Sequence, residues 1–270
     1  MRGVLTKILH ETLLGMVLFS LALLLVEVLL GLVLPQILDQ MDEMMARMPF
    51  VRDLLGALLG IDIEGEITAQ LMQAFVWVHP TVLTLLWANE IMFCTRFPAG
   101  EIDRGTIDIL LALPLSRRRI YLCETIAFLL GGMMMLGAGA IGYAIGSQSL
   151  AVENRPGWSV VALILFNLFC LYVSIGGVAF LVSSISERRG RAVFAVFSVV
   201  VASFLINFLA QFWTPAEPFA FLSVVEYYQP ANIIRNGTLP AGDIAVLLGI
   251  GLVAWLVGRE IVARRSICTT

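Results

Sequence analysis

The sequence has few charged residues: Asp, Glu, Lys and Arg together make up 14% of its 270 residues. A typical soluble domain carries about 25%. Hydrophobic residues make up 59% of the chain, and they are gathered into long runs that contain little or no charge. This composition excludes an ordinary soluble domain and predicts an all-α integral membrane protein.

Histidine and cysteine are also scarce, with two and four copies. None of them forms a cluster with metal-ligand spacing, so no metal site is expected. The cysteines fall in predicted spans or on the cytoplasmic side, where disulfides are not expected. A membrane-embedded enzyme is disfavoured, because the two histidines are predicted to lie on opposite sides of the membrane. These residues are His10, His79, Cys94, Cys123, Cys170 and Cys268.

Six stretches have about the length of a bilayer crossing, which needs roughly 20 apolar helical residues. The fourth and fifth contain no Asp, Glu, Lys or Arg, whereas the second is the most polar and contains His79-Pro80, which we expect to kink it. We interpret residues 1–270 as a single transmembrane domain. The predicted spans lie near residues 13–34, 71–94, 121–146, 158–182, 192–212 and 243–262.

The basic residues are distributed unequally between the two sets of predicted loops. One set, which includes both ends of the chain, holds 13 of the 17 Lys and Arg residues, and the other set holds 4. Loops on the cytoplasmic side carry the excess of basic residues. The sequence therefore predicts six transmembrane helices with both termini in the cytoplasm.

The longest predicted outer connection is residues 35–70. Its apolar residues recur at helical spacing on both sides of Pro49, which predicts two short amphipathic helices at the outer interface. Two roles are open for them: packing on the ends of the spans, which we favour, or gating of a substrate.

The predicted cytoplasmic loop 95–120 contains a short apolar run, 107–113, that is too short to cross a membrane. We expect a helix along the cytoplasmic face, capped by Thr106 and ended by Pro114, with an apolar side that needs a cover. Ser116 is expected to cap the third span. Arg117, Arg118 and Arg119 follow at that helix start, where the dipole disfavours cations. Anionic lipid headgroups or an acidic partner could stabilise them.

This loop carries a family resemblance. The stretch from Glu101 to Arg119, EIDRGTIDILLALPLSRRR, resembles the signature of type-2 ABC transporter permeases. The stretches SSISERRGR at 183–191 and EYYQPANIIRNG at 226–237 are weaker echoes of the same family. Six spans with both ends inside is also the family's plan, although segment 35–70 is longer than in its drug exporters.

The resemblance implies a permease subunit of an ABC transporter, an exporter, in the cell (inner) membrane. In such proteins the first inner loop forms a coupling helix that docks on a cytoplasmic ABC ATPase, and the N-terminal segment forms an amphipathic helix on the inner face. The ATPase-coupling residues carried over by the resemblance are Glu101, Arg104, Gly105, Thr106, Leu110, Leu111, Pro114, Ser116 and Arg117.

The resemblance also implies partners. A second permease half is expected, as a homodimer or a heterodimer, together with the lipid bilayer and no nucleic acid. The chain has no G-x-x-x-x-G-K-[ST] phosphate loop. We therefore expect no cofactor and no enzyme activity in this chain, with ATP and Mg bound by the ATPase. A non-transporting membrane scaffold of an ABC ATPase remains an alternative.

Several polar residues fall within the predicted spans, where charge is costly. Glu27 could face a transport pathway or a partner half, or could be a packing residue. We expect Glu90 and Glu124 to pair with Arg96 or with the arginine triplet. Asn167 and Asn207 are expected to form inter-helix hydrogen bonds, and the Gly142/Gly146 pair to pack within the chain or to form a dimer face.

Overall fold

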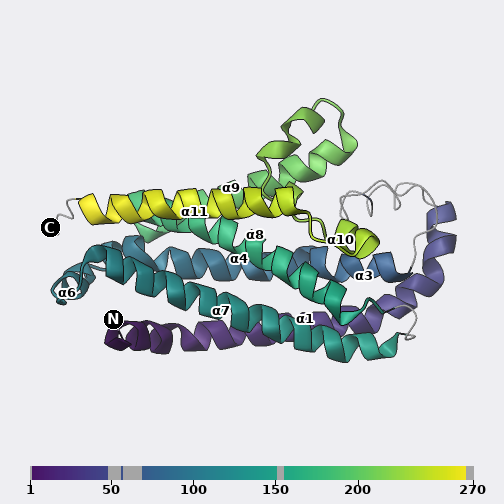
Figure 1. The fold of residues 1–270 in the computed structure, drawn as a ribbon, viewed down its shortest axis with the longest axis horizontal. Helices are drawn as coiled ribbons and strands as arrows, with labels where there is room; N and C mark the ends of the chain where they lie inside the picture. Colours follow the sequence, from purple (N-terminus) through teal and green to yellow (C-terminus); the bar gives the residue numbers. More distant parts are fainter. Residues whose placement is uncertain (1, 48–55, 57–68, 151–154, 266–270) are drawn as a thin grey trace.

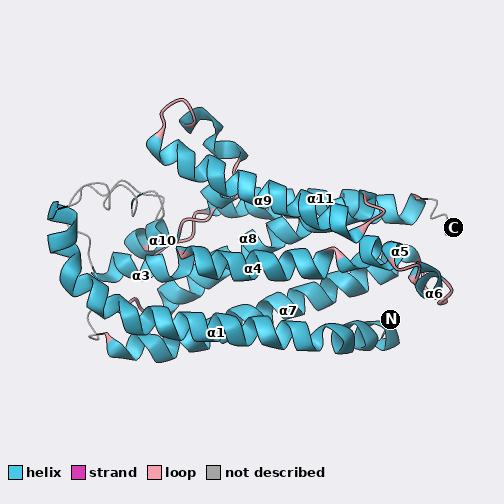
Figure 2. Ribbon diagram, turned by 180° about the vertical axis from the view of Figure 1, so that it is seen from behind, coloured by secondary structure: helices cyan, strands magenta, loops and turns pink. Residues whose placement is uncertain are grey.

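The structure is a computed structural model of the chain (Figure 1). It describes the backbone of residues 2–47, 56, 69–150 and 155–265, and side chains within 2–33, 56, 73–150, 155–211 and 213–265. Within these ranges every regular element is a helix, and Figure 2 shows them joined by short loops. The expectation of an all-α protein is thus confirmed for the described part of the chain.

Five helices in the described part are long and apolar enough to cross a membrane. They are α1 (Arg2–Arg47), α7 (Arg117–Gly146), α8 (Trp158–Ile185), α9 (Arg189–Phe212) and α11 (Ala241–Arg264). The shorter elements are α3 (Ala69–Val78), α4 (Pro80–Cys94), η1 (Arg96–Gly100), α5 (Glu101–Asp103), α6 (Ile107–Leu111), η2 (Ser147–Ser149), η4 (Glu217–Leu222), η5 (Val225–Tyr227) and α10 (Pro230–Asn236).

The predicted second span is broken rather than continuous. α3 has 10 residues and α4 has 15, so neither alone has the length of a crossing. His79 separates them in an extended conformation, and its ring nitrogen Nδ1 accepts a hydrogen bond from the Thr81 backbone N–H. Pro80 lacks an N–H and disfavours helical geometry in the residue before it. The expected kink is therefore a complete break, and the two helices follow one another along the bundle (Figures 1 and 2).

The first helix is longer than predicted at both ends. α1 runs without interruption from Arg2 to Arg47, so the N-terminal segment is not a separate amphipathic helix on the membrane face. Ile8, only 3% exposed, packs into the bundle core, which aligns this segment with the span. The first of the two predicted outer helices is likewise a continuation of α1, and the second lies outside the described residues.

Two close helix pairs form the bundle: α1 packs along α7, and α8 packs along α11. Glycine makes both contacts possible. A Cβ atom added to Gly142 of α7 would lie 2.3 Å from the Leu24 carbonyl oxygen of α1. One added to Gly177 of α8 would lie 2.3 Å from the Gly251 carbonyl oxygen of α11. The Gly142/Gly146 pair is thus occupied by α1 of the same chain, as expected for packing within the chain.

The two chain ends lie at the same end of the bundle. Figure 1 shows the start of α1, the end of α11 and the small helix α6 together there, with α3 and α10 toward the other end. We call the first the terminal end and the second the distal end. This arrangement places the loop with the family signature beside both termini.

Candidate functional site

The candidate site is the loop between α4 and α7 at the terminal end, which contains α5 and α6. The chain leaves α4 through η1, forms the single turn α5, and reverses at Gly105. Gly105 has a φ of 71°, a left-handed conformation that glycine adopts without steric cost. The Arg-Gly-Thr part of the signature is therefore a turn that sets the direction of α6.

The helix α6 presents apolar side chains on two sides. Ile107 and Leu110 are 0% and 6% exposed and pack into the core. Ile109, on the other side, is 66% exposed, and Leu113, just after the helix, is 36% exposed. The predicted uncovered apolar side is present. The helix α6 itself projects at the terminal end of the bundle (Figure 1).

Neither predicted capping side chain makes a capping hydrogen bond. Thr106 is the residue before α6, but its hydroxyl bonds to the carboxylate of Glu101 and makes no capping hydrogen bond. This bond closes the Gly105 turn across α5. Ser116 occupies the N-cap position of α7 without a side-chain capping bond. Pro114 lies in the loop after α6, which ends earlier than predicted, at Leu111.

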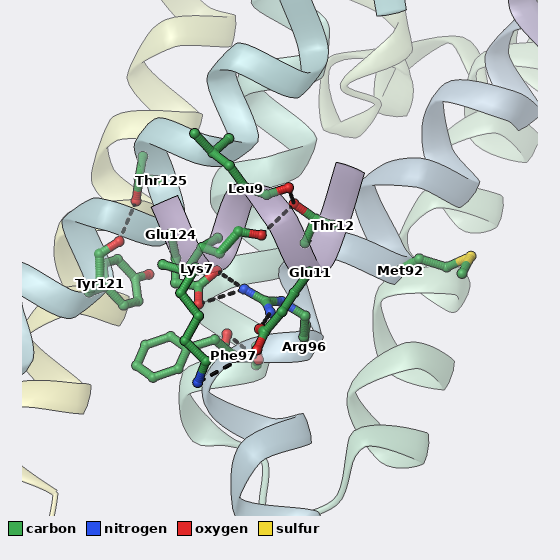
Figure 3. A network of polar contacts seen from close by, with 12 residues as sticks. Lys7, Leu9, Glu11, Thr12, Met92, Arg96, Phe97, Tyr121, Glu124 and Thr125 are labelled. Atoms are coloured by element: carbon green, nitrogen blue, oxygen red, sulfur yellow. Dashed lines mark hydrogen bonds and ion pairs between the residues drawn. The ribbon is translucent and has the colours of Figure 1, made fainter. Parts of the chain in front are cut away.

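A largely buried arginine, Arg96, ties the start of this loop to two long helices (Figure 3). The Arg96 Nη2 donates to both carboxylate oxygens of Glu124 of α7, each at 2.8 Å, and Nη1 donates to Glu11 of α1 at 2.8 Å. Lys7 lies 3.6 Å from the Glu11 carboxylate. The pairing of Glu124 with Arg96 confirms that prediction.

Burial of Arg96 opposes its charge, but the two carboxylates outweigh that effect. Removal of the guanidinium from water acts to lower its pKa, whereas the charge and hydrogen bonds of Glu124 and Glu11 raise it, and the net pKa lies above the ordinary value. The Glu124 side chain is only 3% exposed and that of Arg96 13%. Arg96 therefore stays charged at this junction between η1, α1 and α7.

The prediction for Glu90 is wrong. Its side chain is fully buried, and within the described part of the chain neither carboxylate oxygen has a hydrogen-bond partner. Arg96 points to the Glu124 side instead, and the arginine triplet lies on α7. The spacing of Glu90 and Arg96 in the sequence is compatible both with an ion pair between them and with the buried Glu90 that the structure shows.

Two members of the arginine triplet bind within the chain, a role that sequence reasoning did not identify. Arg117 Nη1 donates to the backbone carbonyl of Arg265 and, at 3.5 Å, to that of Val262. These carbonyls lie in the last turn of α11 and at its C-cap, where the helix dipole favours a cation. Arg118 forms an ion pair with Glu260 of α11 at 2.6 Å. Only the folded structure shows these contacts of Arg117 and Arg118, because α7 and α11 are distant in the sequence.

Arg265 extends this junction to the next loop at the same end. Its Nη1 donates to the Ser184 and Ser186 carbonyls at 2.9 and 3.2 Å, and its Nη2 lies 3.3 Å from Glu187. The end of α11 is thereby attached both to the start of α7 and to the end of α8.

Glu27 lies inside the chain, in contact with α7. It is 0% exposed, and its Cβ lies 2.9 Å from a Cβ position built on Gly142. Among the described residues, neither of its carboxylate oxygens has a hydrogen-bond partner. This position favours the packing interpretation over a side chain that faces a pathway or a partner half.

The two predicted asparagine contacts fix the segment before the last span. Asn167 of α8 accepts from the Gln229 backbone N–H at 3.2 Å, and Asn207 of α9 donates to Glu226 at 2.7 Å. Both partners belong to the stretch 226–237 of the resemblance, Glu226 in η5 and Gln229 just before α10. The bonds therefore join α8 and α9 to that segment rather than to each other. In the described ranges no group of His, Cys, Asp or Glu has the arrangement of a metal site.

Comparison with known proteins identifies the family. Searches of curated proteins and of solved structures found no significant match. A scan against family models matched the description "ABC-2 family transporter protein" over residues 14–258. The match includes the signature loop, the break at His79 and all of the long helices in large part, and it identifies a multi-pass membrane component of a transport system. The chain belongs to the ABC-2 family of transporter proteins.

Proposed function

We propose that this chain is the permease half of an ABC exporter in the cell (inner) membrane, driven by a separate cytoplasmic ATPase. The broken pair α3–α4 forms the second of six crossings, and the terminal end of the bundle faces the cytoplasm. Two observations support this topology. Both termini lie at one end of the bundle, as an even number of crossings requires (Figure 1). The segments that the sequence assigns to that side, helix ends included, carry 13 of the 17 basic residues.

The uncovered apolar side of α6 is the observation that carries the proposal. Ile109 on α6 and Leu113 just after it are exposed in the described part of the chain, and apolar anchors of this kind are typical of the centre of a protein interface. The ATPase binds here, and the Arg96 junction passes its movement to α1 and α7. ATP and Mg are held by the ATPase.

A second permease half completes the transporter, as a homodimer or a heterodimer. α1, α9 and α11 all carry large apolar side chains that are exposed in the described part of the chain. Lipid covers part of this surface and the second half covers the rest. The carried-over residues Glu101, Gly105 and Thr106 shape the loop, and Arg104 is exposed beside them.

The test is co-purification of the ATPase with Ile109→Ala. Removing most of a 66%-exposed anchor side chain leaves the fold intact and should weaken the complex about tenfold or more. Ile185→Ala is the matched control, because Ile185 is 58% exposed at the terminal end but lies outside the α5–α6 loop.

Equal retention of the ATPase by the two variants would contradict the proposed docking site. A complex that assembles normally, but in which ATP hydrolysis never responds to any exported compound, would instead favour the non-transporting scaffold.

A further inference from the structure

Two arginines from different loops lie side by side at the terminal end. Arg104 follows α5, and Arg189 is the first residue of α9. A Cβ atom built on Gly100 would lie 3.3 Å from Arg189 Cδ and 3.6 Å from Arg104 Nη2, so the two side chains cover the same backbone carbon. This close approach concentrates positive charge between the α4–α7 loop and the start of α9.

No acid of the described part neutralises this pair. Neither arginine forms an ion pair there, and the Arg189 Nη2 donates only to the Met92 carbonyl oxygen at 2.9 Å. Of the neighbouring acids, Glu124 pairs with Arg96 and Glu187 with Arg265, while Glu101 accepts a hydrogen bond from Thr106. Asp103, beside Arg104 in the sequence, is exposed and forms no ion pair in the described part of the chain. Two adjacent guanidinium groups repel each other. An anion that binds both of them offsets this electrostatic repulsion.

We propose that Arg104 and Arg189 bind the phosphate of an anionic phospholipid in the leaflet at the terminal end. Guanidinium groups present paired N–H donors that match phosphate oxygens, and the start of α9 adds the positive end of a helix dipole. A zwitterionic lipid fits less well, because its own cation would meet the two arginines. This inference goes beyond the proposed function.

The position of the two arginines relative to the membrane surface favours a lipid over an acidic group of the ATPase. Arg189 opens one of the candidate membrane spans, so it lies where headgroups meet the apolar core. Exposed apolar side chains continue from there along the span: Met92 of α4 is 54% exposed and Phe194 of α9 72%. In Figure 3 the Met92 side chain points away from the Arg96 network. An acyl chain can lie along these residues, while α6 projects farther out (Figure 1).

The experiment measures lipid binding to the purified chain in nanodiscs of phosphatidylcholine, titrated with phosphatidylglycerol and read by native mass spectrometry. Arg104→Gln and Arg189→Gln should each weaken retention of phosphatidylglycerol about fivefold. Arg119→Gln is the control, because it removes an exposed arginine at the same end that forms no ion pair among the described residues. Arg104→Gln changes an exposed side chain outside the core, so it tests the site even if Arg189→Gln fails to fold.

An equal loss in the control would show a general effect of basic charge and would overturn the specific site. Unchanged lipid retention, together with loss of ATPase co-purification in Arg189→Gln, would assign the anion to the partner protein and also overturn it. The ATPase is absent from the lipid measurement, so its outcome is independent of the proposed docking at Ile109.

Discussion

Arg96 is the single residue on which the α4–α7 loop most depends. It bridges Glu124 of α7 and Glu11 of α1, and its side chain is 13% exposed. Removing one partner of a buried ion pair is costly because the remaining charge stays buried. We expect Glu124→Gln to lower the free energy of unfolding by about 3 kcal/mol, measured by denaturant titration in detergent micelles.

The matched control for this change is Glu187→Gln. Glu187 also pairs with an arginine at the terminal end, but its side chain is 72% exposed. Exposed pairs contribute less than about 1 kcal/mol. A loss in Glu124→Gln no larger than that in Glu187→Gln would show that the Arg96 junction is not a stabilising element.

Glu27 yields a second prediction about a single residue. Its full burial against α7, without a hydrogen-bond partner among the described residues, favours a neutral packing side chain. Glu27→Gln should therefore transport as the wild type does at every pH, and Glu27→Leu should raise the melting temperature. Transport assays in proteoliposomes decide the matter. Impaired transport by a normally assembled Gln variant would restore a charge-dependent role in the pathway.

Among the helix contacts, the crossing of α1 and α7 depends on the absence of a side chain. A Cβ atom at Gly142 would lie 2.3 Å from the Leu24 carbonyl oxygen, and backbone cannot move away as a side chain can. Gly142→Ala should cost about 2–3 kcal/mol of stability by forcing the helices apart. The same thermal or denaturant measurement in detergent tests this.

Gly137→Ala serves as the control in the same helix. A Cβ atom at Gly137 would meet nothing within 4 Å, so alanine should be neutral or should stabilise α7 by up to about 1 kcal/mol. Equal stability of Gly142→Ala and Gly137→Ala would show that α1 and α7 do not approach as closely as described.

The sequence predicted helices well where apolar length alone decides them. The predicted spans 121–146, 158–182, 192–212 and 243–262 coincide with α7, α8, α9 and α11 within a few residues. The extent of α1 was not predictable, because burial of Ile8 and the contact of Glu11 with Arg96 depend on the packed bundle. The break at His79 was foreseen only as a kink, since Pro80 is compatible with both outcomes.

The candidate site was predictable in position but not in detail. The Arg-Gly-Thr turn and the short apolar run marked the α5–α6 loop, and both are present. The bond of Thr106 to Glu101 and those of Arg117 to the end of α11 depend on the folded backbone. Spacing in the sequence therefore could not assign partners to these side chains, nor could it show that Glu90 lies apart from Arg96.

At the scale of the whole molecule, the proposed function requires α6 and both termini on the cytoplasmic side and residues after α9 on the outer side. Three single-cysteine variants test this directly, in a chain whose four native cysteines are replaced. Ile109→Cys lies on α6, Arg118→Cys at the start of α7, and Glu217→Cys in η4 at an exposed position.

The deciding measurement is labelling of these cysteines in intact cells with a membrane-impermeant maleimide. We predict that Glu217→Cys reacts at once, whereas Ile109→Cys and Arg118→Cys react only after the membrane is permeabilised. Reaction of Ile109→Cys from the outside would place α6 on the wrong side for a cytoplasmic ATPase. Reaction of Glu217→Cys only after permeabilisation would place η4 on the inner side. Either result would contradict the proposed permease.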